Sequence, residues 1–112
     1  MEISFQALGA DIVLIRLNGR LDAIASPNLK IALETKLGEG HRKIIVDLEN
    51  VSFIDSSGLV ALVSGLRMAR QEKGDIFLSG MRPHAQAVFR LTMLDRVFSI
   101  HPTFDDAKRS LV

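Results

Sequence analysis

Short, continuous apolar runs between helical segments constrain the fold of this chain more than any other feature. Residues 44–46, followed by Leu48, form one such run, and residues 76–78 form another. Strands without polar alternation are typical of parallel sheets that are covered on both faces. Parallel neighbours need a crossover connection, which is usually a right-handed one through a helix. The chain is therefore predicted to have an α/β fold.

The order of the remaining segments completes this prediction. Two amino-terminal runs rich in β-branched residues flank a Gly-Ala-Asp turn and predict a hairpin. Ser26 and Pro27 predict a helix start with Ser26 as its cap. We expect one domain over residues 1–112, in β-β-α-β-α-β-α-β-α order, with a mixed, mainly parallel sheet of about five strands and about four helices. The expected strands cover residues 3–8, 12–17, 44–48, 76–78 and 97–100. The expected helices begin at residues 26, 57, 83 and 104; the first ends at Gly38 or Gly40, and the others end at residues 73, 94 and 111.

Composition excludes several classes of function. The 112 residues include no cysteine, which excludes disulfides, thiolate metal sites and a cysteine nucleophile. Fourteen Lys and Arg against thirteen Asp and Glu give a formal net charge of +1, so no global field attracts a nucleic acid or an anionic membrane. The absence of Tyr and Trp removes the usual ring platforms for bases. No cofactor is expected.

The sequence also predicts where the protein resides. It begins without the basic and apolar regions of a signal peptide, and no stretch approaches the ~18 apolar residues of a membrane-spanning helix. We therefore expect a cytoplasmic protein without membrane insertion. The three histidines, His41, His84 and His101, lack the spacing of metal ligands, so no metal site is expected.

The segment Asp55-Ser56-Ser57-Gly58 is the most informative part of the chain. It ends a loop that we expect over residues 49–55. One interpretation is structural: Asp55 or Ser56 caps the next helix, and Gly58 permits close packing. The other is chemical, because an exposed serine at a helix start is a suitable phosphate acceptor. Repulsion from Asp55 means that a phosphate there would act as a switch rather than as an anchor.

Two carboxylate-bearing loops are expected to meet. Asp22 follows the second strand, and Asp55 follows the third. Ligands and partners contact α/β sheets at the carboxyl ends of their strands. If the second and third strands are neighbours, Asp22 lies near the Asp-Ser-Ser-Gly turn.

The residues around the turn do not form a recognisable catalytic site. Ser56 lacks a Gly-x-Ser-x-Gly context and has no identifiable histidine partner. Asp22, Asp47 and Asp55 do not follow the spacing of an aspartyl-phosphate receiver. We expect no catalytic residues and no enzymatic activity.

The helix after the turn has two distinct faces. At 100° per residue, one face forms a core stripe of Leu59, Leu62, Val63, Leu66 and Ala69. The opposite face is small or apolar, where a solvated helix normally carries Lys and Glu. It is either covered by a neighbouring element or is a partner-docking face that begins at the acceptor serine. The residues of this opposite face are Ser57, Val60, Ala61, Ser64 and Met68.

Three stretches resemble the STAS domains, and among them the free-standing bacterial anti-sigma factor antagonists. The first is Gly-Arg-Leu-Asp at residues 19–22, and the second covers residues 45–59 and ends in Asp-Ser-Ser-Gly-Leu. The third is the tail over residues 88–111, with its Leu-Thr-x-Leu-Asp-x-Val-Phe helix end. Together with the element order, the resemblance covers essentially the whole chain and implies the STAS fold.

The resemblance also implies a mechanism. In such proteins the unmodified antagonist binds an anti-sigma factor that is also a serine kinase, and this frees a sigma factor for transcription. The kinase phosphorylates the first serine of the motif, here Ser56, and the antagonist is released. A serine phosphatase resets it. Carried onto this chain, Asp22 and Asp55 belong to the contact surface around Ser56, while Ser57 and Gly58 shape the turn.

Two positions depart from the family pattern. Val60 stands where many members have Gly, and Met93 replaces the usual Gly of a Thr-Gly-Leu helix end. The first change alters the expected docking face and leaves a second role open. In that role the chain is an adaptor subunit of a lipid-transport ATPase or of a sensory complex without a sigma factor.

Overall fold

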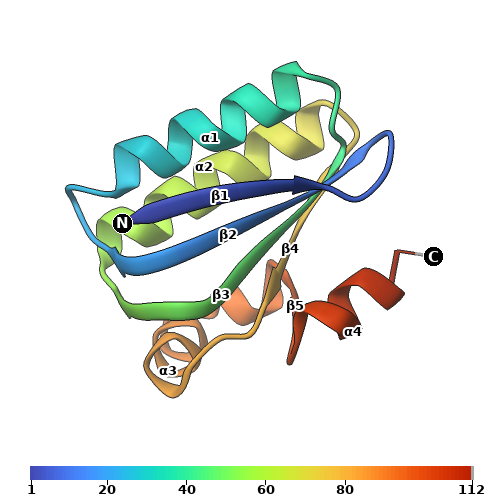
Figure 1. Cartoon of the computed structure of the whole chain (residues 1–112). Helices are drawn as coiled ribbons and strands as arrows, with labels where there is room; N and C mark the ends of the chain where they lie inside the picture. The colour runs from blue at the N-terminus through green and yellow to red at the C-terminus, as the bar shows by residue number, and fades with distance from the viewer. Residues whose placement is uncertain (112) are drawn as a thin grey trace.

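The computed structural model describes residues 1–111 and contains a five-stranded sheet in the order β1-β2-β3-β4-β5 (Figure 1). β1 is antiparallel to β2, and β2 to β5 are parallel. The predicted α/β fold with a mixed, mainly parallel sheet is therefore confirmed.

The strands are β1 (Glu2–Ala7), β2 (Ile12–Leu21), β3 (Lys43–Ile54), β4 (Asp75–Ser79) and β5 (Ser99–His101). The helices are α1 (Ser26–Gly38), α2 (Ser56–Gln71), α3 (Pro83–Leu91) and α4 (Phe104–Arg109), with a 3-10 turn η1 (Leu94–Arg96). Within residues 1–111, no helix is long and apolar enough to cross a bilayer.

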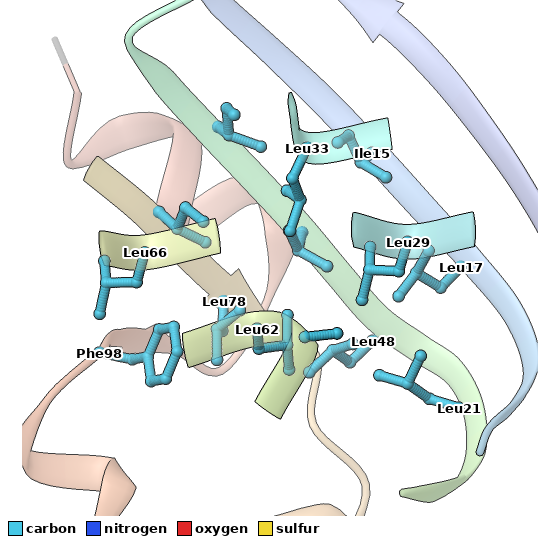
Figure 2. Packing of buried hydrophobic residues seen from close by; sticks show 14 of the residues in the cluster. Ile15, Leu17, Leu21, Leu29, Leu33, Leu48, Leu62, Leu66, Leu78 and Phe98 are labelled. Atoms are coloured by element: carbon cyan, nitrogen blue, oxygen red, sulfur yellow. The ribbon is translucent and has the colours of Figure 1, made fainter. Parts of the chain in front are cut away.

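The sheet is covered by helices on both faces. α1 and α2 lie side by side over one face, and α4 lies on the other (Figure 1). Along β2, Val13, Ile15 and Leu17 belong to the main core, whereas Leu14 packs in a second, smaller cluster with Ala107 of α4. Figure 2 shows the leucines of α1 and α2 pointing onto the strands in the main core. Burial on both faces explains why the central strands read as continuous apolar runs.

Gly65 permits the close contact between α1 and α2. A methyl group at this position would overlap Cδ1 of Leu33 on α1, and it would lie 3.3 Å from Cδ1 of Ile76 on β4. Leu33 and Ile76 are both fully buried. The two helices can therefore lie directly against each other only because residue 65 has no side chain.

Two strands are longer than predicted. β2 continues to Leu21 rather than ending at residue 17, and β3 continues to Ile54, so the prediction of a loop over residues 49–55 was wrong. The two strands stay paired through two irregularities in register, and Leu21 finally lies opposite Ile54. Glu49 and Asn50 are polar and exposed, and they interrupt the apolar pattern of β3. For this reason the extension of β3 was not predicted from the sequence. The longer strands bring the two candidate loops to the same end of the sheet.

Met93 adopts a left-handed backbone conformation between α3 and η1, with φ of 61°. This is the conformation that glycine adopts most easily, and a non-glycine residue raises the local free energy there. The side chain of Met93 is 60% exposed, so it contributes little packing in return. At this position the chain therefore has a methionine in a conformation that glycine would adopt at lower cost.

We expect Met93→Gly to raise the free energy of unfolding by about 1 kcal/mol, because it relieves this conformational cost. Arg90→Gly, at an exposed position inside α3, is the matched control and should lower it by about 1 kcal/mol. Urea unfolding of both variants measures the difference. Equal destabilisation by both substitutions would contradict the interpretation.

Candidate functional site

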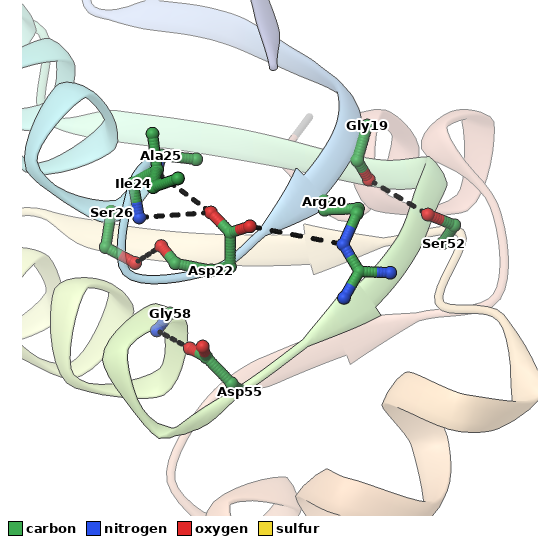
Figure 3. A network of polar contacts seen from close by, with 9 residues as sticks. All are labelled: Gly19, Arg20, Asp22, Ile24, Ala25, Ser26, Ser52, Asp55 and Gly58. Atoms are coloured by element: carbon green, nitrogen blue, oxygen red, sulfur yellow. Dashed lines mark hydrogen bonds and ion pairs between the residues drawn. The ribbon is translucent and has the colours of Figure 1, made fainter.

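The loops after β2 and β3 meet at one end of the sheet. The backbone N–H of Asp55 donates to the carbonyl of Leu21 at 3.3 Å, directly beyond the last paired residues of the two strands. The predicted approach of Asp22 to the Asp-Ser-Ser-Gly turn follows from this pairing (Figure 3). The site is therefore built on two neighbouring strand ends and the starts of α1 and α2.

Asp55 caps α2. Its Oδ1 accepts a hydrogen bond from the backbone N–H of Gly58 at 3.1 Å (Figure 3), which confirms the structural interpretation of the turn for Asp55. Gly58 sits tightly against β2, since a methyl group there would lie 2.7 Å from the carbonyl oxygen of Leu21. Ser56 is the first residue of α2 and is exposed. The cap is thus made by the neighbour of Ser56, which leaves the Ser56 side chain facing solvent.

Asp22 organises the loop before α1. Its Oδ1 accepts hydrogen bonds from the backbone N–H groups of Ile24 and Ala25, both at 3.1 Å (Figure 3). The hydroxyl of Ser26 donates to the Asp22 carbonyl oxygen at 2.6 Å. Ser26 therefore does not cap α1 as predicted: its hydroxyl is a donor, and Ala25, which stands at the N-cap position, makes no side-chain cap. Pro27 stands in the first turn, as expected.

A stack of charged and aromatic side chains lies beside Asp22, and the sequence alone did not indicate it. The Arg20 guanidinium lies 4.2 Å from the centroid of the Phe53 ring, and its Nε is 4.0 Å from Oδ2 of Asp22. The Phe53 ring in turn stacks on His84, with centroids 5.4 Å apart and an interplanar angle of 16°. Nε2 of His84 lies 3.4 Å from the carbonyl oxygen of Ile54. Arg20 and Phe53 are register partners on β2 and β3. Their contact could therefore have been predicted only from the register in which the two strands pair.

A groove of about 480 Å³ begins at Ser56 and runs between the first turns of α1 and α2. Its mouth includes Val60, which is 67% exposed although it is apolar. Lys30 provides a positive charge on the α1 side. The groove is lined by Ala23, Ser26, Pro27 and Lys30 from the α1 side, and by Ser56, Ser57, Val60, Ala61 and Ser64 from α2.

The small and apolar face of α2 divides into two parts. Ser57, Val60 and Ser64 line the open groove, so this part is not covered by a neighbouring element. Ala61 also borders the groove but is only 4% exposed and belongs to the main core, so at this residue the face is covered by neighbouring elements. Met68 is half-buried and packs on the main core, in a separate hollow with Glu34 and Leu37 of α1. The helix crossing at Gly65 separates Met68 from the groove.

The site residues do not form a metal centre in the part of the chain that the structure describes. Across residues 1–111, no three carboxylate or imidazole side chains gather as ligands. Both oxygens of Asp22 and one oxygen of Asp55 have partners within the chain. The arrangement is suited to a surface that meets another molecule at an exposed serine.

Comparison with known proteins places this architecture in a family. The family model described as the STAS domain matches residues 8–107. The chain belongs to the STAS domain family. The resemblance carried by the Gly-Arg-Leu-Asp, Asp-Ser-Ser-Gly and carboxyl-terminal stretches is thereby confirmed.

Several of the proteins that this chain is similar to are described as antagonists of anti-sigma factors. The anti-sigma-B factor antagonist of Staphylococcus aureus is 30% identical over 87 residues, which are 78% of this chain and 81% of that protein. The phosphorylated form of the Bacillus cell fate determinant SpoIIAA is 25% identical, with a TM-score of 0.78 over 99% of this chain and 100% of that chain. An anti-sigma factor antagonist from Mycobacterium paratuberculosis shares the fold, with 24% identity and a TM-score of 0.84 over 97% and 93% of the two chains.

Proposed function

We propose that this STAS protein is an anti-sigma factor antagonist whose affinity for its partner is controlled by phosphorylation of Ser56. The observation that carries the proposal is the division of roles at the start of α2. Asp55 makes the cap, and the exposed Ser56 is free for modification beside an open groove. Phosphorylation of Ser56 therefore breaks no hydrogen bond on which the helix start depends.

The electrostatics of the turn give the phosphate two opposite effects. The amino terminus of α2 favours an anion, so the modified side chain is tolerated by its own chain. A charge of about −1.5 to −2 next to Asp55, however, makes the surface strongly anionic. Against a formal net charge of only +1, one phosphate reverses the sign of the whole protein. A partner fitted to the neutral serine is then repelled.

The proposed partner surface consists of the turn and the groove. Asp22, Asp55, Ser57 and Gly58 hold the two loops in place around Ser56. Val60 and Ser64 line the groove, buried Ala61 borders it, and Met68 lies in the separate hollow farther along α2. The apolar mouth at Val60 would receive an apolar side chain of the partner.

The partners are proposed from the family relationship together with this geometry. The binding partner is an anti-sigma factor with serine kinase activity, and a serine phosphatase removes the phosphate. The protein itself catalyses nothing in this scheme, since Ser56 only receives the phosphoryl group. Such a cycle operates in the cytoplasm, where sigma factors act.

The direct test is phosphorylation by the serine kinase of the source organism in the presence of ATP. We expect a single phosphate on Ser56, located by peptide mass spectrometry. Ser56→Ala should remove it entirely. Ser110→Ala is the matched control and should leave it in place, because Ser110 is an exposed serine outside the turn and the groove.

Phosphate on Ser57, or none on Ser56, would contradict the proposal. A pull-down that recovers a transport ATPase subunit and no kinase would instead favour the adaptor role. The pull-down thus separates the two candidate functions.

A further inference from the structure

β1 leaves one edge of the sheet open. One of its edges pairs with β2, and within residues 1–111 no strand pairs with its second edge. At the opposite end of the sheet, β5 has only three residues and is followed by Pro102, and both features discourage pairing. β1 has six residues, and from Ile3 to Ala7 it contains neither a proline nor a charge. This edge therefore exposes backbone donors and acceptors without the usual protection.

We propose that β1 pairs with β1 of a second copy of this chain, antiparallel, about a two-fold axis through Ser4. An axis perpendicular to the sheet keeps the α1 and α2 helices of both copies on the same face, which extends the sheet from five strands to ten. In this register Ile3 lies opposite Phe5 of the second copy, and Glu2 lies opposite Gln6. No like charges meet along the edge.

The side chains of β1 fit this register. Phe5 is 48% exposed, although apolar, while Ile3 is half-buried and packs against the main core. Pairing puts an aromatic ring next to a β-branched side chain on each side of the axis, which is a favourable cross-strand combination. Lys36 lies 4.5 Å from the centre of the Phe5 ring, and its ammonium already bonds to Glu39 at 3.0 Å. That charge does not oppose a second copy.

A second copy is favoured over another kind of partner because the edge is complementary to itself. The contact is limited to one short strand per copy, far less than the ~2,000 Å² or more that permanent interfaces bury, so we expect a weak and concentration-dependent dimer. β1 also lies outside the part of the chain that matches the family model, which covers residues 8–107. The proposal is independent of the proposed function, since neither Ser56 nor its groove takes part.

Cross-linking tests the register directly, because the chain has no cysteine of its own. Ser4→Cys puts one thiol on the two-fold axis, where the Cβ atoms of directly opposite residues lie about 4.5–5.5 Å apart, close to disulfide range. Gln6→Cys is the matched control on the same face of β1, away from the axis. We expect Ser4→Cys to form a disulfide-linked dimer at least tenfold faster than Gln6→Cys under mild oxidation.

Sedimentation equilibrium measures the association itself. The mass of the unmodified protein should rise toward twice the monomer between roughly 10 µM and 1 mM. Ser4→Glu should weaken this association at least tenfold, since it puts like charges on the axis, whereas its own Arg16 partner on β2 accommodates the charge in the monomer. Circular dichroism checks that each variant is folded. A monomer at 1 mM, or equal cross-linking rates for the two cysteine variants, would overturn the proposal.

Discussion

Ser56→Asp should weaken binding to the anti-sigma factor at least 100-fold, which corresponds to about 2.7 kcal/mol or more. Aspartate puts a fixed negative charge at the exposed start of α2, directly after Asp55, which caps the helix. Like charges brought together in an interface cost several kcal/mol, because both lose water as the partner approaches. Isothermal titration calorimetry with the purified partner measures the change in Kd.

Two control variants distinguish the effect of the added charge from the effect of a changed side-chain shape at the partner surface. Ser56→Ala removes only a solvent-facing hydroxyl and should retain the Kd within about threefold. Ser110→Asp adds the same charge at an exposed position just after α4, on the other side of the sheet, and should also have little effect. Full-strength binding by Ser56→Asp would show that charge at this position does not control the partner.

Gly58→Ala should lower the free energy of unfolding by about 2 kcal/mol and loosen the turn that carries Ser56. The added methyl group would lie 2.7 Å from both the carbonyl oxygen and Cγ of Leu21, which is fully buried. A backbone carbonyl at a strand end cannot move aside as a flexible side chain can, so α2 must shift away from β2. The higher helix propensity of alanine offsets only about 1 kcal/mol of this strain.

Gly38→Ala is the matched control for this prediction. It makes the same change at the end of α1, where a methyl group would meet no atom within 4 Å. Chemical denaturation should show an unchanged or slightly higher stability for this variant. If both substitutions had equal effects, the close approach of Gly58 to β2 would not be a determinant of stability.

The sequence predicted the strands and helices well where a single physical signal dominates. Residues 44–48 and 76–78 are apolar because both faces of the sheet are covered, and the predicted α2 start is right because a cap and a leucine stripe coincide there. The extension of β3 to Ile54 was missed because exposed Glu49 and Asn50 interrupt the apolar run, although Val51 and Ile54 beyond them are buried in the main core. A continuous apolar run indicates a strand that is covered on both faces, and strand pairing continues through exposed polar residues.

The candidate site was predictable in its centre and not at its borders. Asp55 and Ser56 are neighbours in sequence, so their roles follow from local helix-start chemistry. The groove depends on how closely α1 approaches α2, and that distance is determined by Gly65 and Leu33, which are far apart in the chain. Ala61 is buried for the same reason, namely that α1 lies close to α2. Helical periodicity gives the direction of a side chain but not the position of the neighbouring helix.

The strand order of the sheet has a consequence for how the chain folds. Because β1 to β5 lie side by side in the order of their synthesis, each new strand adds to the open edge of those already paired. No strand has to enter between two others, and the largest sequence gaps to be closed are single crossover connections. Such a sheet can grow from its amino-terminal end while the ribosome is still producing the rest, with few long loops to close.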